Sequence, residues 1–485
     1  MQETWFVAQE HLPLDLGPGT DLIPSLDALI KGTTNTLATV VSGTLQACAP
    51  QVTPQQGTPQ QGTPRQGAQG SPQGNPQEVV PQISDPARLS TLAGLPLLQQ
   101  LAMLPRESIS EFVAQHPTVL QQLISTPPAA HEVQLWWGDM AVDSRSALLS
   151  SAPYLVGNLE GVPFPTRDWA NRHLLEGSMK TLGDAAEGGR SKAIDASNQL
   201  HMLQQIADAL VAPKGAPARY LLNLNPIGTG TAAIVIGDLS TADYVSFLVP
   251  GMFYTVDGQM VDWATAAQSF YDTESAWMTQ LSQTETDLEG ATVATVAWIG
   301  YETPSLVNFT SLDLAYAGRD AIADAINGLR TMRGGDQPYL SLIAHSYGST
   351  AAMMALTDYG IDIDAIGIVG SPGSSAQLAS DLGVPGNSVY VGEADWDQVK
   401  DTAFFGSDPG SNGFGAHVFS VDGGADPLTG APMVGSTGHN EYFVVGSESI
   451  RNLALVALGQ GRLVTTDNAP AVAKGSSAYT VSHSG

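Results

Sequence analysis

Short apolar runs bounded by turn residues dominate the second half of the chain, and they predict buried strands. These runs lie at residues 219–224, 232–236, 244–249, 294–298, 339–343, 363–369 and 388–391. Helical periodicity separates the later runs, as in residues 315–329. Strands that alternate with helices in this way favour an α/β fold, in which helices cover both faces of a mostly parallel sheet.

The first half of the chain has a different pattern. Residues 84–210 show helical periodicity with breaks at prolines, whereas residues 51–77 are rich in Pro, Gln, Gly and Thr and repeat Gln-Gln-Gly-Thr-Pro at 55–59 and 60–64. Such a repeat buries too little apolar surface to offset its ordering entropy, so it predicts a disordered linker. The expected organisation is an N-terminal segment (1–50), a linker (51–80), a helical region (81–215), an α/β domain (216–465) and a polar tail (466–485).

Composition narrows the range of partners. The chain has 485 residues, of which 43% are hydrophobic, and its 47 acidic against 19 basic side chains give a formal net charge of -28. This length and hydrophobic content support a sizeable core. The negative charge repels phosphate backbones and anionic lipid surfaces, so neither a nucleic-acid partner nor a stable membrane insertion is expected.

Signals for targeting and for metal binding are scarce. The start of the chain lacks a basic segment followed by an apolar one, and no run of 18 apolar residues occurs. The expected location is cytoplasmic by default, with signal-independent export left open. Because Cys48 is the single cysteine, an intrachain disulfide and a cysteine-based zinc site are excluded.

The strongest chemical motif is Ala344-His345-Ser346-Tyr347-Gly348, which joins the predicted strand at 339–343 to a predicted helix start. Small-x-Ser-x-Gly in this context predicts a nucleophile elbow, a strained turn that presents one hydroxyl at a helix N-terminus. Ser346 is therefore the candidate nucleophile.

A serine hydroxyl needs a base to take its proton and a carboxylate to orient that base. On folds with such an elbow, the acid and then the histidine follow the serine along the chain. We predict Asp397 as the acid, with Asp395 as the alternative, because both follow the strand at 388–391. His439 lies in a Gly-flanked polar loop and is the predicted base; His345, next to the serine, is expected to point away from it.

Acyl transfer also requires two donors for the oxyanion that develops on the carbonyl oxygen. The backbone N–H of Tyr347, directly after the nucleophile, is the first expected donor. The second should come from the loop after the strand at 244–249, where Met252 is favoured and Phe253 is the alternative.

Six motifs in this order resemble an actinobacterial alpha/beta-hydrolase family first catalogued as a domain of unknown function, DUF1023. They lie at residues 157–171, 249–252, 296–304, 344–349, 369–373 and 438–439. The resemblance runs from about residue 135 to residue 459, and it implies an alpha/beta-hydrolase fold preceded by a helical region. It also implies that a Ser-Asp-His triad falls on Ser346, Asp397 and His439.

These features predict a serine hydrolase that cleaves carboxylic esters through an acyl-enzyme and needs no metal or organic cofactor. An acyltransferase or peptidase that uses the same triad, or a non-catalytic binding protein, is the alternative. The expected substrate is a small-molecule or lipid-like ester, and protein partners are not indicated. Residues 136–171, within the helical region, are expected to line or shield the cleft.

Overall fold

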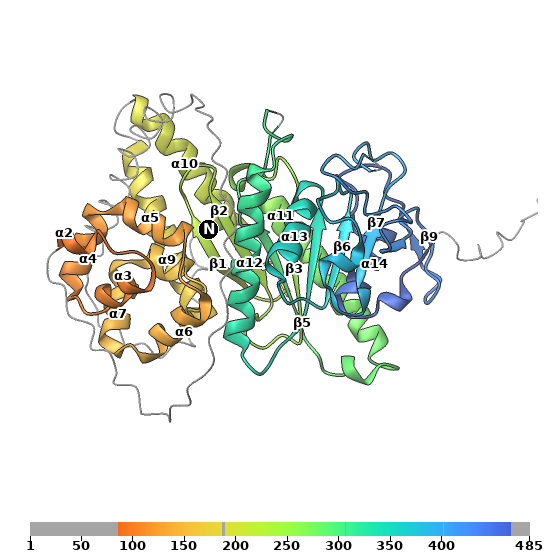
Figure 1. The fold of residues 1–485 in the computed structure, drawn as a ribbon, viewed down its shortest axis with the longest axis horizontal. Coiled ribbons are helices and arrows are strands. Elements are labelled where there is room, and N and C mark those ends of the chain that lie inside the picture. Colours follow the sequence, from red (N-terminus) through yellow and green to blue (C-terminus); the bar gives the residue numbers. More distant parts are fainter. Residues whose placement is uncertain (1–85, 187–189, 306, 401, 467–485) are drawn as a thin grey trace, which may run out of the picture.

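The computed structural model describes residues 86–186, 190–305, 307–400 and 402–466. The predicted N-terminal segment (1–50) and linker (51–80) lie outside these residues, as does nearly all of the predicted tail. Figure 1 shows a central sheet flanked by helices, with the helical region beside one end of the sheet.

Eight strands form the main sheet in the order β1-β2-β4-β3-β5-β6-β7-β8. They are β1 (Arg219–Asn225), β2 (Thr231–Ile236), β3 (Tyr244–Val249), β4 (Val293–Ile299), β5 (Tyr339–His345), β6 (Ala365–Val369), β7 (Val389–Gly392) and β8 (His417–Phe419). Strands β3 to β8 are parallel to one another, whereas β2 is antiparallel to both β1 and β4. This mostly parallel sheet confirms the predicted fold class, and all seven predicted strands are present.

The helices are α2 (Pro86–Leu89), α3 (Gly94–Leu101), α4 (Arg106–Gln115), α5 (Pro117–Ser125), α6 (Ala130–Asp139), α7 (Val142–Ser151), α8 (Pro153–Asn158), α9 (Phe164–Ala186), α10 (Arg190–Ala209), α11 (Val256–Leu281), α12 (Asp313–Arg333), α13 (Tyr347–Tyr359) and α14 (Glu448–Ala457). Four single 3-10 turns lie at Thr286–Leu288, Ala379–Leu382, Pro385–Asn387 and Gly461–Leu463. A small hairpin, β9 (Gly424–Ala425) with β10 (Pro432–Met433), precedes α14.

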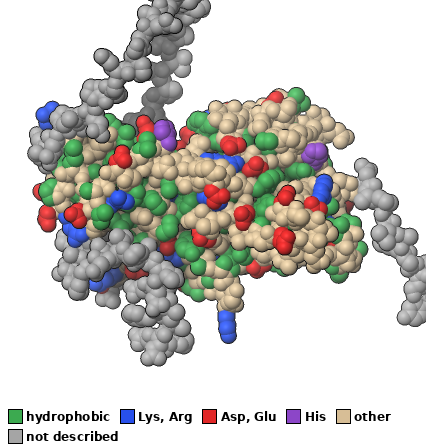
Figure 2. All heavy atoms as spheres, turned by 90° about the horizontal axis from the view of Figure 1, so that it is seen from below, with side chains coloured by type: hydrophobic (Ala, Val, Ile, Leu, Met, Phe, Trp, Pro, Cys, Tyr) green, Lys and Arg blue, Asp and Glu red, His purple; other side chains and the backbone are tan. Residues whose placement is uncertain are grey.

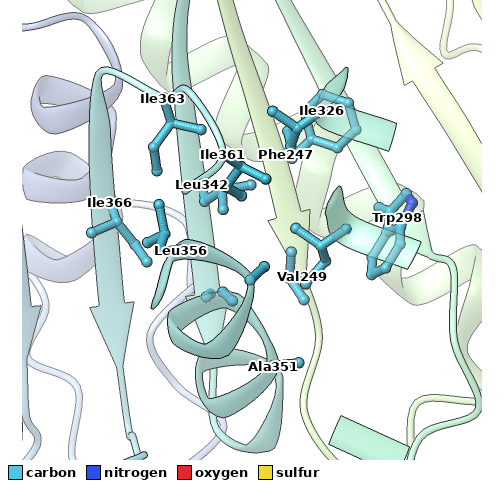
Figure 3. Close-up of a cluster of buried hydrophobic side chains, with 14 of the residues drawn as sticks. Phe247, Val249, Trp298, Ile326, Leu342, Ala351, Leu356, Ile361, Ile363 and Ile366 are labelled. Atoms are coloured by element: carbon cyan, nitrogen blue, oxygen red, sulfur yellow. The ribbon is translucent and has the colours of Figure 1, made fainter. Parts of the chain in front are cut away.

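Alternate residues of each central strand enter two separate cores, because successive side chains of a strand point to opposite faces. On one face, called here the α13 face, Phe247, Val249 and Leu342 pack against α12 and α13 (Figure 3). On the other, called here the α11 face, Leu248 and Ile343 pack with side chains of α10, α11 and α14. The parallel strands are buried on both faces, which explains why they read as continuous apolar runs.

Polar side chains of α8 and α9 cover the outer edge of β1. Asn158 donates to the carbonyl of Leu224 and accepts from its N–H, at 2.8 and 3.0 Å. Asn171 donates to the carbonyl of Leu221 at 3.0 Å, and Asp168 accepts from the N–H of Leu221 at 2.6 Å. These side chains take the place of a neighbouring strand, and an edge covered in this way cannot pair with another chain.

The helical region packs beside the β1 edge of the sheet, where α8 and α9 contact β1 (Figure 1). Trp136 and Trp137 belong to a core formed among the helices α2 to α9. Arg167 binds the carbonyl of Gly157 and pairs with Glu160. The structure places Trp136 and Trp137 in this helical core and Asn158, Asp168 and Asn171 against β1, and the expectation that the segment lines or shields the cleft stays a prediction.

Figure 2 shows acidic side chains spread over one face of the molecule among apolar and neutral groups, while basic side chains are scattered singly. That face offers no continuous basic patch of the kind that binds phosphate backbones. Within the described residues, every helix is too short or too polar to span a lipid bilayer.

Candidate active site

The chain turns sharply from β5 into α13 at Ser346. This residue has φ +54° and ψ -132°, a backbone conformation that residues other than glycine rarely adopt and that costs about 1–3 kcal/mol. A Cβ added to Gly348 would lie 2.3 Å from the carbonyl oxygen of Pro250, and one added to Gly251 would lie 2.4 Å from the Cβ of Ser346. Glycine is therefore required on both sides of the turn, which is the geometry expected of a nucleophile elbow.

Ser346, His439 and Asp397 form one chain of hydrogen bonds. The Nε2 atom of His439 lies 2.8 Å from Oγ of Ser346, and its Nδ1 atom lies 2.9 and 3.0 Å from the two carboxylate oxygens of Asp397. A carboxylate only accepts, so Nδ1 carries the imidazole hydrogen and Nε2 is free to accept the serine proton. The structure thus brings together the three side chains predicted as nucleophile, base and acid.

Each of these side chains comes from a different loop at the carboxyl ends of the strands. Asp397 follows β7, and His439 lies between β10 and α14. The alternative acid, Asp395, is 80% exposed and lies 3.5 Å from the ammonium of Lys400, so it is not part of the hydrogen-bonded chain.

The surroundings of Asp397 favour its ionised form. Burial acts to raise its pKa, but hydrogen bonds from His439, Tyr442 and the N–H of Val399 outweigh burial and hold the pKa below its usual range. Tyr442 donates to Asp397 at 2.7 Å, while its hydroxyl oxygen accepts from the N–H of Ala394 at 2.9 Å. An ionised Asp397 can orient the imidazole of His439 and stabilise it when it becomes protonated.

One predicted oxyanion donor, Tyr347, lies in the elbow itself, and the other, Met252, lies on the loop after β3. Tyr347 begins α13, so its N–H has no partner within the helix. The N–H of Phe253 donates to the carbonyl of Pro304 at 3.0 Å, which removes the alternative donor. Among the described residues, the amides of Tyr347 and Met252 donate to no protein group.

His345 contacts the base, a relationship that sequence reasoning missed. Its side chain does avoid the nucleophile as predicted, but its Nε2 atom lies 2.7 Å from the backbone carbonyl of His439. The two rings are 4.7 Å apart. Burial is the main cause that lowers the pKa of His345 to about 4, and the positive charge that His439 can carry is the second. The side chain of His345 is therefore neutral near pH 7. No local motif could have revealed a contact between residues 94 positions apart.

No group of three or more His, Cys, Asp or Glu side chains in the described part of the chain is arranged to hold a metal ion. The hydrogen-bonded chain of Ser346, His439 and Asp397 is instead an arrangement typical of covalent acyl transfer.

Two curated relatives match the sequence. Both are named as uncharacterized proteins of Mycobacterium tuberculosis, and each is 26% identical over 406 residues that cover 73% of this chain. The alignment covers 60% of each relative, so the chain spans less than two thirds of their length.

Several solved structures are also similar. They include a carboxyl esterase from the fungus Tuber melanosporum (12% identity, 51% of this chain and 87% of that one, TM-score 0.31) and an esterase from Pyrobaculum calidifontis (11% identity, 56% and 94%, TM-score 0.29). Similarity at this level carries no information about the substrate.

A family sequence model described as "Alpha/beta hydrolase" matches residues 225–407, a segment that contains β2 to β7, Ser346 and Asp397. The mostly parallel sheet and the position of the elbow agree with that match. The match of residues 225–407 and the similarity to the mycobacterial relatives therefore support an alpha/beta-hydrolase family for this chain.

Proposed function

We propose that this protein is a serine hydrolase that cleaves carboxylic esters through a covalent acyl-enzyme. The observation that carries the proposal is the continuous chain of hydrogen bonds from Asp397 through His439 to the Oγ of Ser346. The ionised acid sets the tautomer of the base, and the base can accept the proton of the nucleophile.

In the first half of the reaction, the Oγ of Ser346 attacks the ester carbonyl while the Nε2 of His439 takes its proton. The carbonyl π electrons move to oxygen, and the N–H groups of Tyr347 and Met252 stabilise the resulting oxyanion. Each such donor contributes about 3 kcal/mol to stabilisation of the transition state. Collapse of the tetrahedral intermediate breaks the ester C–O bond, and protonated His439 returns the proton to the departing alcohol.

In the second half, water replaces the alcohol. The side chain of His439 is 23% exposed, so the base is not sealed from solvent. His439 removes a proton from this water as its oxygen adds to the acyl carbon. Collapse of this second tetrahedral intermediate breaks the bond between the acyl carbon and Oγ of Ser346, the acid leaves, and protonated His439 returns the proton to Oγ. An acyltransferase or peptidase would use the same groups and differ in the acceptor or in the leaving group.

The proposal is tested by fluorophosphonate labelling and by hydrolysis of p-nitrophenyl acetate. We expect the full chain to be labelled and active, Ser346→Ala to be unlabelled and inactive, and the exposed control Ser375→Ala to behave like the unmodified protein. Full turnover by Ser346→Ala would refute the assignment. Release of an acetylated alcohol in the presence of added methanol would show that transfer competes with hydrolysis.

A further inference from the structure

Four aromatic side chains form a continuous row that starts beside the candidate nucleophile. The rings of Tyr347 and Phe405 lie 5.6 Å apart, those of Phe405 and Phe404 4.9 Å apart, and those of Phe404 and Phe309 6.1 Å apart. This aromatic row, Tyr347-Phe405-Phe404-Phe309, connects the residue directly after Ser346 with two loops that follow β4 and β7.

The inner end of the aromatic row is held rigidly. The buried hydroxyl of Tyr347 donates to the carbonyl of Ser311 at 2.6 Å and accepts from the N–H of Ala315 at 3.0 Å. The N–H of Phe405 donates to the carbonyl of Pro372 at 3.1 Å. Because α13, the loop after β6 and the start of α12 all anchor it, this end does not depend on a ligand for its position.

The outer end of the row is apolar and open to solvent. Phe404 is 51% exposed, and Val307, close to Phe309 in sequence, is 91% exposed. Phe253, next to the proposed oxyanion donor Met252, is 47% exposed and is tied to the loop after β4 through Pro304. Exposed apolar side chains such as these gain free energy when an apolar ligand covers them.

The aromatic row and the loop that carries the base pack on opposite faces of the sheet whose strand β5 leads to Ser346. Tyr347 and Phe405 pack with the core of the α13 face. The base loop packs on the other face, because Tyr442 and Phe443, just after His439, join the core of the α11 face. His439 must protonate the departing alcohol, so the alcohol part of an ester lies on the side of His439. The acyl chain is then directed towards the aromatic row.

We propose that the aromatic row is the acyl-binding surface of this site, and that the substrates are esters with an extended apolar acyl chain. This inference rests on the proposed ester hydrolysis and adds which half of the ester the protein selects. Phe404 and Phe309 contact the distal methylenes of the acyl chain, while buried Tyr347 and partly buried Phe405 hold these two rings in place from the core.

A pair of isomeric esters tests the inference. Methyl octanoate has its long chain on the acyl side and octyl acetate has it on the alcohol side, while methyl acetate reports the basal reaction. We expect kcat/KM to be higher for methyl octanoate than for octyl acetate. Phe404→Ser and Phe309→Ser should each reduce the methyl octanoate to methyl acetate ratio of kcat/KM by roughly tenfold. Leu135→Ser, an exposed control in α6, should leave the ratio unchanged.

Binding to the Ser346→Ala protein provides a readout without turnover. Saturation-transfer NMR with methyl octanoate should show contact at the acyl methylenes, and Phe404→Ser in the same background should abolish it. The inference is overturned if kcat/KM is higher for octyl acetate than for methyl octanoate. It is also overturned if the methyl octanoate to methyl acetate ratio of kcat/KM is unchanged in both Phe404→Ser and Phe309→Ser, or if the methylene contact persists after Phe404→Ser. The proposed function fails instead if the unmodified chain neither reacts with fluorophosphonate nor cleaves methyl acetate.

Discussion

His345 donates a hydrogen bond from Nε2 to the backbone carbonyl of His439, at 2.7 Å. A carbonyl oxygen only accepts, so this contact places the imidazole hydrogen of His345 on Nε2. His345 is the last residue of β5, immediately before the nucleophile. One side chain therefore ties the strand that carries Ser346 to the loop that carries the base, and it stays uncharged beside an imidazole that must become positive.

Removal of this donor should slow turnover without weakening substrate binding. We expect His345→Phe, which keeps a buried ring, to lower kcat roughly five- to tenfold and to leave KM unchanged, because one net hydrogen bond is lost. His345→Gln retains an N–H donor and should recover most of kcat. Steady-state kinetics with p-nitrophenyl acetate, with thermal unfolding as a check on folding, measures both. Equal losses in the two variants would assign the effect to packing rather than to the hydrogen bond.

Tyr442→Phe should destabilise the fold in a pH-dependent way. The substitution removes a donor from Asp397 and leaves the N–H of Ala394 without an acceptor, which costs about 1–3 kcal/mol at neutral pH. The pKa of Asp397 is lowered in the folded protein, so its stabilisation is present above the unfolded pKa and is lost as the pH falls through the folded value.

Urea unfolding measures this effect. The difference in free energy of unfolding between Tyr442→Phe and the unmodified chain should be largest near neutral pH and should shrink below about pH 4. Tyr316→Phe, at an exposed tyrosine of α12, is the control and should show no difference at either pH. A constant difference across the pH range would mean that only the contact with Ala394 matters.

Local pattern and chain order were sufficient to predict most of the fold and the three side chains that the structure joins by hydrogen bonds. The strands are apolar runs, the elbow is a contiguous motif, and the order Ser346, Asp397, His439 follows from the fold. Contacts that depend on strand order could not be predicted. Nothing in the sequence identifies β1 as the edge strand of the sheet, so the role of Asn158 and Asn171 in covering that edge could not be inferred. The segment that contains both residues, 136–171, was instead expected near the cleft.

Glu274 should make the fold less stable at alkaline pH. This carboxyl group of α11 is fully buried on the α11 face, where it accepts from Ser246 of β3 at 2.6 Å and from Thr295 of β4 at 2.8 Å. Burial raises its pKa to about 8, against the opposing effect of these hydroxyl donors. An acid with a raised folded pKa is stabilising when protonated, so its contribution is lost as the pH rises from its unfolded pKa through about 8.

Glu274→Gln keeps a neutral side chain of the same shape and should remove that pH dependence. We expect its free energy of unfolding to fall less than that of the unmodified chain between about pH 5 and about pH 9, by a few kcal/mol. Chemical denaturation across this range measures the slopes, with Glu289→Gln as the exposed control. Parallel slopes for Glu274→Gln and the unmodified chain would show that Glu274 does not titrate there.

The side chains that cover β1 should matter for stability and not for catalysis. Asn158→Ala leaves both the N–H and the carbonyl of Leu224 without a partner in a buried position, which should lower the free energy of unfolding by about 1–3 kcal/mol. The exposed Asn198→Ala in α10 should cost much less. Both variants should keep the kcat and KM of the unmodified chain for methyl octanoate, because Asn158 supports β1 at the edge of the sheet, and three strands separate β1 from β5, which leads into the elbow. A raised KM in Asn158→Ala alone would instead mean that α8 and α9 shape the substrate site.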